Sequence, residues 1–220
     1  MVLCQRTPFC CIAKKHGFLV GRNTQFWHLD CDCPVEFLDW WFKKPNLSRH
    51  IYLARKYKPK YAVAPDIWKP HDIEVSLMVA KKLRQYASNV IIPIHFHCED
   101  KIPEEFIIGL PSQTSFAKAS LWIGNPSLIE RKIHILGGSP HRQMMLAKHY
   151  LKNVVSVDSN MIARNAIYFG KYWQDGKWIL NKKYPKPPAS SKDWLSKKDD
   201  SLYKVFEISC KNVIEAWRKL

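Results

Sequence analysis

The sequence predicts an α/β protein: a compact or degenerate (β/α)8 TIM-like barrel with a basic, Trp-rich C-terminal extension. Eight short apolar runs, most of them ending in a polar or glycine residue, lie within residues 18–158 and indicate strands. Helical patterns between several of these runs are typical of parallel strands joined by right-handed crossovers. Such a barrel usually needs about 250 residues. The chain has 220, so a doubly wound open sheet is the alternative fold.

The expected strands are short, and several are apolar almost throughout, which is typical of strands buried on both faces. They cover Phe18–Gly21, Gln25–Asp30, Tyr61–Asp66, Val90–His95, Phe106–Leu110, Leu121–Gly124, Ile133–Gly138 and Val154–Asp158. Because the carboxyl ends of barrel strands meet on one rim, the last residues of these runs are the candidates for a shared site.

Three helices are expected between the strands. Apolar residues at helical spacing indicate one over residues 47–57. Asp72 is expected to cap the second. Ser139 is expected to cap the third, because Pro140 suits the first helical position.

The composition changes after residue 158. A helix is expected over residues 160–169 and another over residues 202–220. Between them, residues 171–180 read as two short strands joined at the turn signal Asp175-Gly176.

These patterns divide the chain into a barrel-like catalytic domain, residues 1–170, and a basic extension packed on the barrel, residues 171–220. The extension holds 12 Lys+Arg, 6 Asp+Glu and four tryptophans. Basic residues interleaved with aromatics can bind nucleic acid. The alternative is that the tryptophans only fasten the extension to the barrel.

The chain carries 35 Lys+Arg against 19 Asp+Glu, which gives a formal net charge of +16 and a pI near 9.6. A charge of this size attracts polyanions, of which nucleic acid is the commonest. An acidic membrane surface and a charge that only confers solubility are the alternatives. No apolar run is long enough to span a bilayer, so we expect no membrane partner.

The seven cysteines are irregularly spaced and no secretory signal is recognisable, which favours a reducing, cytoplasmic location over a disulfide framework. The zinc candidates lack the paired CxxC spacing of structural zinc sites. They are Cys31, Cys33, His97 and Cys98. We therefore expect no cofactor, and zinc is left open.

Polar or glycine residues close most of the expected strands, so a site is expected on their shared rim. They are Asp30, Asp66, His95, Gly109-Leu110, Gly137-Gly138-Ser139 and Asp158. A single aspartate in such a place is more often a helix cap, but carboxylates that end apolar strands are costly to bury without a partner. Two carboxylates can act as nucleophile and proton carrier in glycosyl transfer. The alternative is a nuclease whose carboxylates hold Mg²⁺.

Ile133–Pro140 (IHILGGSP), followed by Val154–Asp158 (VVSVD), resembles the closing section of the queuine/archaeosine tRNA-guanine transglycosylases, an LxGxGxP turn before a strand that ends in the nucleophilic aspartate. In the same order as in that family, Trp27–Asp30 (WHLD), Tyr61–Asp66 (YAVAPD) and Ile108–Leu110 (IGL) resemble earlier motifs. The DSGGFQ and FDC signatures and the C-terminal zinc motif are absent. In this, and in its length, the chain is similar to the compact DpdA-type enzymes of phages and genomic islands.

The resemblance implies exchange of guanine in DNA for a 7-deazaguanine base such as preQ0, in a nucleotide flipped out of the stack. Asp158 would attack C1′, Asp30 would carry the proton, and Asp66 would bind the guanine edge. The remaining rim residues would contact the substrate: His95, Gly109 and Leu110 at the O6 side, and Gly137, Gly138 and Ser139, at a helix start, at a phosphate.

The implied reaction must exclude water, and the candidate lids are Lys101–Glu105 and Ser112–Lys118. DNA is the preferred partner, in the host cytoplasm if the protein is viral. The alternatives are a tRNA-guanine transglycosylase, a metal-dependent nuclease and a non-catalytic basic nucleic-acid-binding protein.

Overall fold

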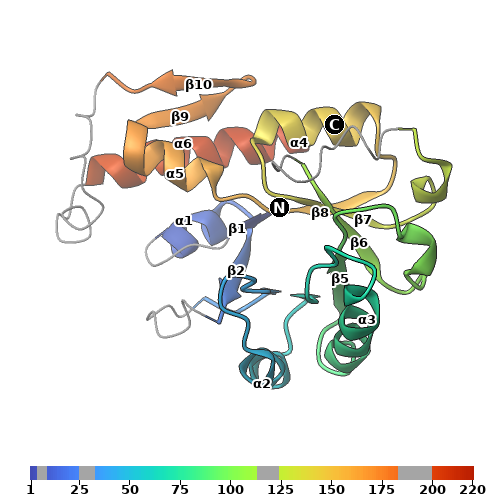
Figure 1. Ribbon diagram of the computed structural model, residues 1–220. Coiled ribbons are helices and arrows are strands. Elements are labelled where there is room, and N and C mark those ends of the chain that lie inside the picture. Colours follow the sequence, from blue (N-terminus) through green and yellow to red (C-terminus); the bar gives the residue numbers. More distant parts are fainter. Residues whose placement is uncertain (4–8, 25–32, 113–123, 183–199) are drawn as a thin grey trace.

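A computed structural model describes residues 1–3, 9–24, 33–112, 124–182 and 200–220, and is shown in Figure 1. Its centre is a curled sheet of eight parallel strands in chain order. The strands are β1 (Val2–Leu3), β2 (Leu19–Asn23), β3 (Phe37–Asp39), β4 (Tyr61–Val63), β5 (Asn89–Pro93), β6 (Ile107–Pro111), β7 (Ile133–Leu136) and β8 (Val154–Val157). The predicted α/β class and the parallel sheet are confirmed.

The sheet curls until its first strand reaches the end of its last. Val2 of β1 forms a parallel bridge with Asp158, and the N–H of Ser159 donates to the Val2 carbonyl at 3.4 Å. Figure 1 shows the amino terminus beside β8. Buried side chains of five strands pack together on the concave face, namely Val2, Phe37, Tyr61, Val63, Ile91 and Ile107. This inner cluster fills the concave side of the sheet, because five of the eight strands contribute buried side chains to it.

The alternate residues of the same strands face a second core, which covers the convex side. Val90, Ile92 and Ile94 lie there with apolar side chains of the helices α2 (Leu47–Tyr57), α3 (Asp72–Leu83) and α4 (Pro140–His149). Figure 1 shows α2 and α3 on the outside of the sheet. Strands that bury both faces must be apolar at nearly every position, which is why their pattern was visible in the sequence.

Local capping sets the helix starts. The Asn46 side chain accepts from the Arg49 N–H at 2.9 Å before α2, and the Ser139 side chain accepts from the Arg142 N–H at 3.3 Å before α4. The expected cap of α3 is wrong by one residue. Asp72 is the first helical residue, and its carboxylate accepts from the N–H groups of the preceding turn instead.

Two strands of the sheet were not expected, β1 and β3, because at two and three residues they are too short to show a periodicity. Helix α1 (Phe9–Lys15) was also missed. The expected strand Gln25–Asp30 lies outside the described residues, as does Leu121–Gly124 except for Gly124, which lies in a turn.

A third core lies beside the sheet, where α1, α5 (Met161–Phe169) and α6 (Asp200–Trp217) pack with the hairpin of β9 (Lys171–Gln174) and β10 (Lys177–Leu180). The expected hairpin is confirmed, since Asp175 and Gly176 both adopt positive φ, as a tight hairpin turn requires. Trp173 is buried. Its backbone N–H donates to Ser209 Oγ, and its backbone carbonyl accepts from the Asn212 side chain. This tryptophan therefore fastens the hairpin to α6.

Candidate active site at the carboxyl ends of the strands

Three aspartates converge at the carboxyl ends of the parallel strands. Asp39 is the last residue of β3, Asp66 lies three residues after β4, and Asp158 directly follows β8. Burial raises the pKa of Asp39 well above its ordinary value, and the negative charges of Asp158 and Asp66 raise it further. Because each of these charges perturbs the same carboxyl, the three groups form one site.

Asp158 is held by one of its two oxygens. Its Oδ1 accepts the N–H of Gly137 at 3.0 Å and lies 3.1 Å from Nε2 of His134. The His134 ring is fully buried, stacks on Phe37, and has Ser156 Oγ 2.8 Å from its Nδ1. A neutral ring that accepts from the Ser156 hydroxyl and donates from Nε2 satisfies both contacts. Both bonds to Asp158 use Oδ1, so neither engages Oδ2.

The glycine turn after β7 wraps around Asp158. Nε2 of Gln143, a buried residue of α4, donates at 2.7 Å both to the Gly137 carbonyl and to the Asp158 carbonyl. Gly138 has φ +87°, and a Cβ there would lie 2.1 Å from Ser112 Oγ. The turn therefore needs glycine and fixes the backbone on both sides of the carboxylate. In this structure the Ser139 side chain caps α4.

Asp66 pairs with His95, which lies two residues after β5. The Oδ1 atom of Asp66 is 2.9 Å from Nε2 of His95, and both side chains are mostly buried. The Trp68 ring stacks on the imidazole with centroids 3.5 Å apart and planes at 7°. Nδ1 of His95 has no hydrogen-bond partner in the described part of the chain. An indole with 37% of its surface exposed thus lies over a carboxylate–imidazole pair.

Gly109 and Leu110 lie inside β6 rather than in a turn beyond it. The Gly109 carbonyl accepts from the Ile94 N–H, and a Cβ at Gly109 would meet the Ile91 side chain at 3.0 Å. The Leu110 side chain packs in the convex core. Both residues therefore have a packing role in the sheet.

The expected proton carrier Asp30 lies outside the described residues, as does the zinc candidate Cys31. Burial raises the pKa of the Cys98 thiol to about 11. His97 Nδ1 lies 3.4 Å from a Glu99 oxygen. In contrast, Cys33 Sγ lies 3.6 Å from Cys11 Sγ.

Of the two candidate lids, Lys101–Glu105 is fastened to the body. Arg131 donates to the Glu99 carbonyl at 3.1 Å and to the Pro103 carbonyl at 3.0 Å. In the second candidate lid, Ser112 is buried and its hydroxyl donates to the Gly137 carbonyl, whereas residues 113–118 lie outside the described part.

Sequence reasoning missed Asp39, His134 and Gln143. Asp39 ends an apolar run, Phe37-Leu38, as the expected site aspartates do, so the same signal was present on a shorter strand. His134 is the one polar residue of the otherwise apolar strand β7, and such a residue indicates a polar partner on a neighbouring strand. Gln143 gave no signal, because its role depends on how α4 is oriented.

The protein-family model that matches residues 13–218 is described as a family of unknown function, DUF6610. The chain belongs to the DUF6610 family. No curated protein and no solved structure matches it.

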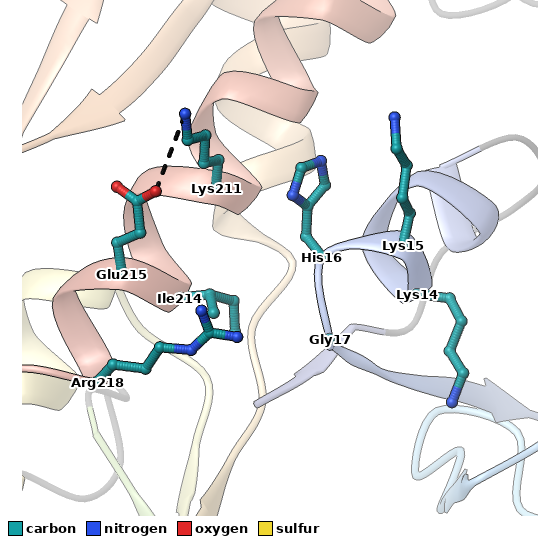
Figure 2. A pocket seen from close by; sticks show the side chains of 8 residues that line it. All are labelled: Lys14, Lys15, His16, Gly17, Lys211, Ile214, Glu215 and Arg218. Carbon is teal, nitrogen blue, oxygen red and sulfur yellow. Dashed lines mark ion pairs between the residues drawn. The ribbon is translucent and has the colours of Figure 1, made fainter.

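A basic hollow of about 560 Å³ lies elsewhere on the DUF6610 chain, between the end of α1 and the end of α6, as Figure 2 shows. It is lined by Lys14, Lys15, His16, Gly17, Lys211, Ile214, Glu215 and Arg218. Carboxylates compensate much of this charge, since Glu36 pairs with Lys14, Glu207 with Lys15 and His16, and Glu215 with Lys211. Gly17 precedes β2, so the hollow lies at the amino end of that strand, away from the carboxyl ends that carry the aspartates.

Among the described residues of this DUF6610 chain, no helix combines the length and the apolar character that crossing a membrane requires.

Proposed function

We propose that this protein exchanges guanine in DNA for a 7-deazaguanine base such as preQ0, through a covalent bond between Asp158 and the deoxyribose. The observation that carries the proposal is the convergence of Asp39, Asp66 and Asp158 at the carboxyl ends of β3, β4 and β8, where burial and the two neighbouring charges raise the pKa of Asp39. Glycosyl exchange needs one carboxylate as nucleophile and a second carboxyl that can hold a proton near neutral pH. Two aspartates in different environments on one rim suit this pair of roles.

In the proposed first step, Oδ2 of Asp158 attacks C1′ of the flipped nucleotide, and the bond from C1′ to the base nitrogen breaks. Its electron pair leaves with guanine, which takes a proton from Asp39. In the second step, Asp39 removes a proton from the incoming base, whose nitrogen attacks C1′ and releases Asp158. The contacts of Asp158 Oδ1 with Gly137 and His134 support this role, because they orient the carboxylate without engaging Oδ2.

Asp39 takes the proton-carrying role that the sequence suggested for Asp30. The reason is its position at the end of β3, together with the burial and the neighbouring charges that favour its protonated form. A carboxyl that is easily protonated can give a proton to a leaving base and recover it from the next.

Asp66, His95 and Trp68 are proposed to bind the base. A carboxylate accepts from the N1 and N2 groups of guanine, and an indole face can stack on the purine ring. His95 lies 2.9 Å from Asp66 Oδ1 and under the Trp68 ring, so it would hold both groups in place for the base.

We also propose that the sheet closes as a (β/α)8 barrel. The bridge between Val2 and Asp158 supports closure, because it joins the first strand to the end of the eighth. In a closed barrel, the carboxyl ends of β3, β4 and β8 would surround one substrate.

The net charge of +16 supports a nucleic-acid substrate. The test is incorporation of labelled guanine, and then of labelled preQ0, into duplex DNA and into tRNA. We expect label in DNA with the wild-type protein and with Asp100→Asn, an exposed control, and none with Asp158→Asn. Label in tRNA alone would assign the other substrate, and no label in either would refute base exchange.

The rival nuclease hypothesis has less support. The site aspartates do not form a group of three ligand atoms within 4.8 Å of one another, whereas three cysteines of the described chain do. Strand cleavage in the same assay that stops on chelation would nevertheless favour a nuclease. DNA binding that is unchanged in Asp158→Asn, without any chemistry in the wild type, would leave a binding protein.

A further inference from the structure

Three cysteine thiols gather where α1 approaches the segment that leads into β3. Cys10 and Cys11 belong to α1, and Cys33 lies four residues before β3 begins. The Sγ atoms of Cys10 and Cys11 are 3.8 Å apart, and those of Cys11 and Cys33 are 3.6 Å apart. All three sulfurs lie within 4.8 Å of one another, and no other group in the described ranges brings three potential metal ligands this close.

The spacing fits one tetrahedral metal ion. A Zn–S bond of about 2.3 Å and tetrahedral angles place neighbouring sulfurs about 3.8 Å apart. A disulfide needs sulfurs about 2.05 Å apart, so the thiols are not bonded to one another. Thiolates that bind different irons of a cluster would stand farther apart than thiolates that share one ion.

Charge balance supports the same conclusion. A divalent ion with three thiolates has a net charge of −1, because each thiol gives up its proton as its sulfur binds. Arg22 is almost fully buried in β2, and its Nη2 lies 3.5 Å from Cys10 Sγ. The guanidinium therefore offers the compensating positive charge beside the sulfurs.

We propose that Cys10, Cys11 and Cys33 bind one zinc ion. Zinc suits a thiolate-rich tetrahedral site without redox chemistry, and a water molecule or a further donor completes the fourth position. The ion ties α1 to the segment that enters β3, the strand that ends in Asp39. Its role is structural, because it joins two segments whose cysteines, Cys11 and Cys33, are 22 residues apart in sequence.

The test measures zinc bound to the full-length, untagged protein after dialysis against metal-free buffer, by elemental mass spectrometry. We expect about one ion per chain in the wild type and in the control Cys98→Ala, and roughly tenfold less in Cys11→Ala and Cys33→Ala. Cys11 is exposed, so its replacement should not disturb the core. Stoichiometric zinc in both cluster variants, or none in the wild type, would overturn the proposal.

Two further measurements on the wild type do not depend on how the variants fold. Cobalt added to the zinc-free protein should give the visible bands of a tetrahedral ion and a thiolate charge-transfer band. Bound zinc should protect Cys11 and Cys33 from alkylation, and chelation should remove that protection. An octahedral cobalt spectrum, or alkylation that zinc does not change, would contradict the site.

Discussion

Asp158 offers the sharpest test of the proposed site, because Asn and Ala remove different properties from it. An Asn side chain keeps an oxygen that can accept from Gly137 N at 3.0 Å and from His134 Nε2 at 3.1 Å. Ala leaves both donors without that acceptor. A buried donor that loses its acceptor costs about 1–3 kcal/mol, which applies to the fully buried His134. Gly137 is half-buried, so water can partly replace its acceptor, and the two losses together amount to about 2–4 kcal/mol.

The two variants should therefore separate stability from chemistry. A chain of this size loses about 2–4 °C in Tm for each kcal/mol. Both variants relieve the repulsion at Asp39, but only Ala leaves the two donors unpaired, so Asp158→Ala should melt on the order of 10 °C below Asp158→Asn. Asp158→Asn should melt close to the wild type, because weaker hydrogen bonds to a neutral amide are offset by less repulsion at Asp39. Both variants should lose base exchange completely.

The assay pairs thermal unfolding followed by circular dichroism with incorporation of labelled guanine into DNA. Base exchange by Asp158→Asn at the wild-type rate would refute the assignment of Asp158 as the nucleophile. Equal melting temperatures of the Asn and Ala variants would instead refute the stabilising role of the two hydrogen bonds, and the exchange assay would still decide whether Asp158 is the nucleophile.

Three further predictions concern titration and the glycine turn. Asp39→Asn should raise the free energy of unfolding more in alkaline than in acidic buffer, because the raised pKa of wild-type Asp39 means that its charged form destabilises the fold; equal gains in urea denaturation would contradict that raised pKa. Burial lowers the pKa of His50 to about 4. As the pH falls below about 6.5, the free energy of unfolding should therefore decrease by up to about 3 kcal/mol. In urea denaturation, His50→Leu should make the free energy of unfolding less dependent on pH in this range. Gly138→Ala, at φ +87° against Ser112, should cost about 2 kcal/mol, and melting should show partial recovery when Ser112→Ala is added.

Local chemistry was readable from the sequence. The boundaries of α2 agree with the expected range, and α4 begins at the expected cap. In both helices a capping side chain accepts from one N–H of the first turn, three residues along the chain, so the signal is complete in a short window. The apolar strands β5 and β7 were readable because their burial on two faces shows in composition alone.

Only part of the candidate site could be predicted from the sequence, because strand register and sheet curvature decide which residues come together there. Asp39 lies on a strand of three residues, which exists only because β2 and β4 pair with it. The role of His134 depends on the register between β7 and β8. That register places His134 opposite Ser156 and within hydrogen-bond distance of the Asp158 carboxylate. The clustering of Cys33 with Cys10 and Cys11 required α1, which the sequence did not reveal.

The charge distribution places a constraint on any ligand of the rim. Asp66 and Asp158, joined by Asp39 whenever it ionises, put negative charge in one place on a chain with a net charge of +16. Phosphates would be attracted by the chain as a whole but repelled by these carboxylates. A ligand that is attracted by the whole chain and not repelled by the carboxylates must place its phosphates outside the rim. The part of the ligand that lies within the rim must be neutral or electron-poor. A nucleotide flipped toward Asp158 meets this condition, because positive charge develops at C1′ as the base leaves, and carboxylates stabilise that charge. The same cluster that makes Asp39 hard to ionise would therefore favour the transition state over the bound substrate, which is what catalysis requires.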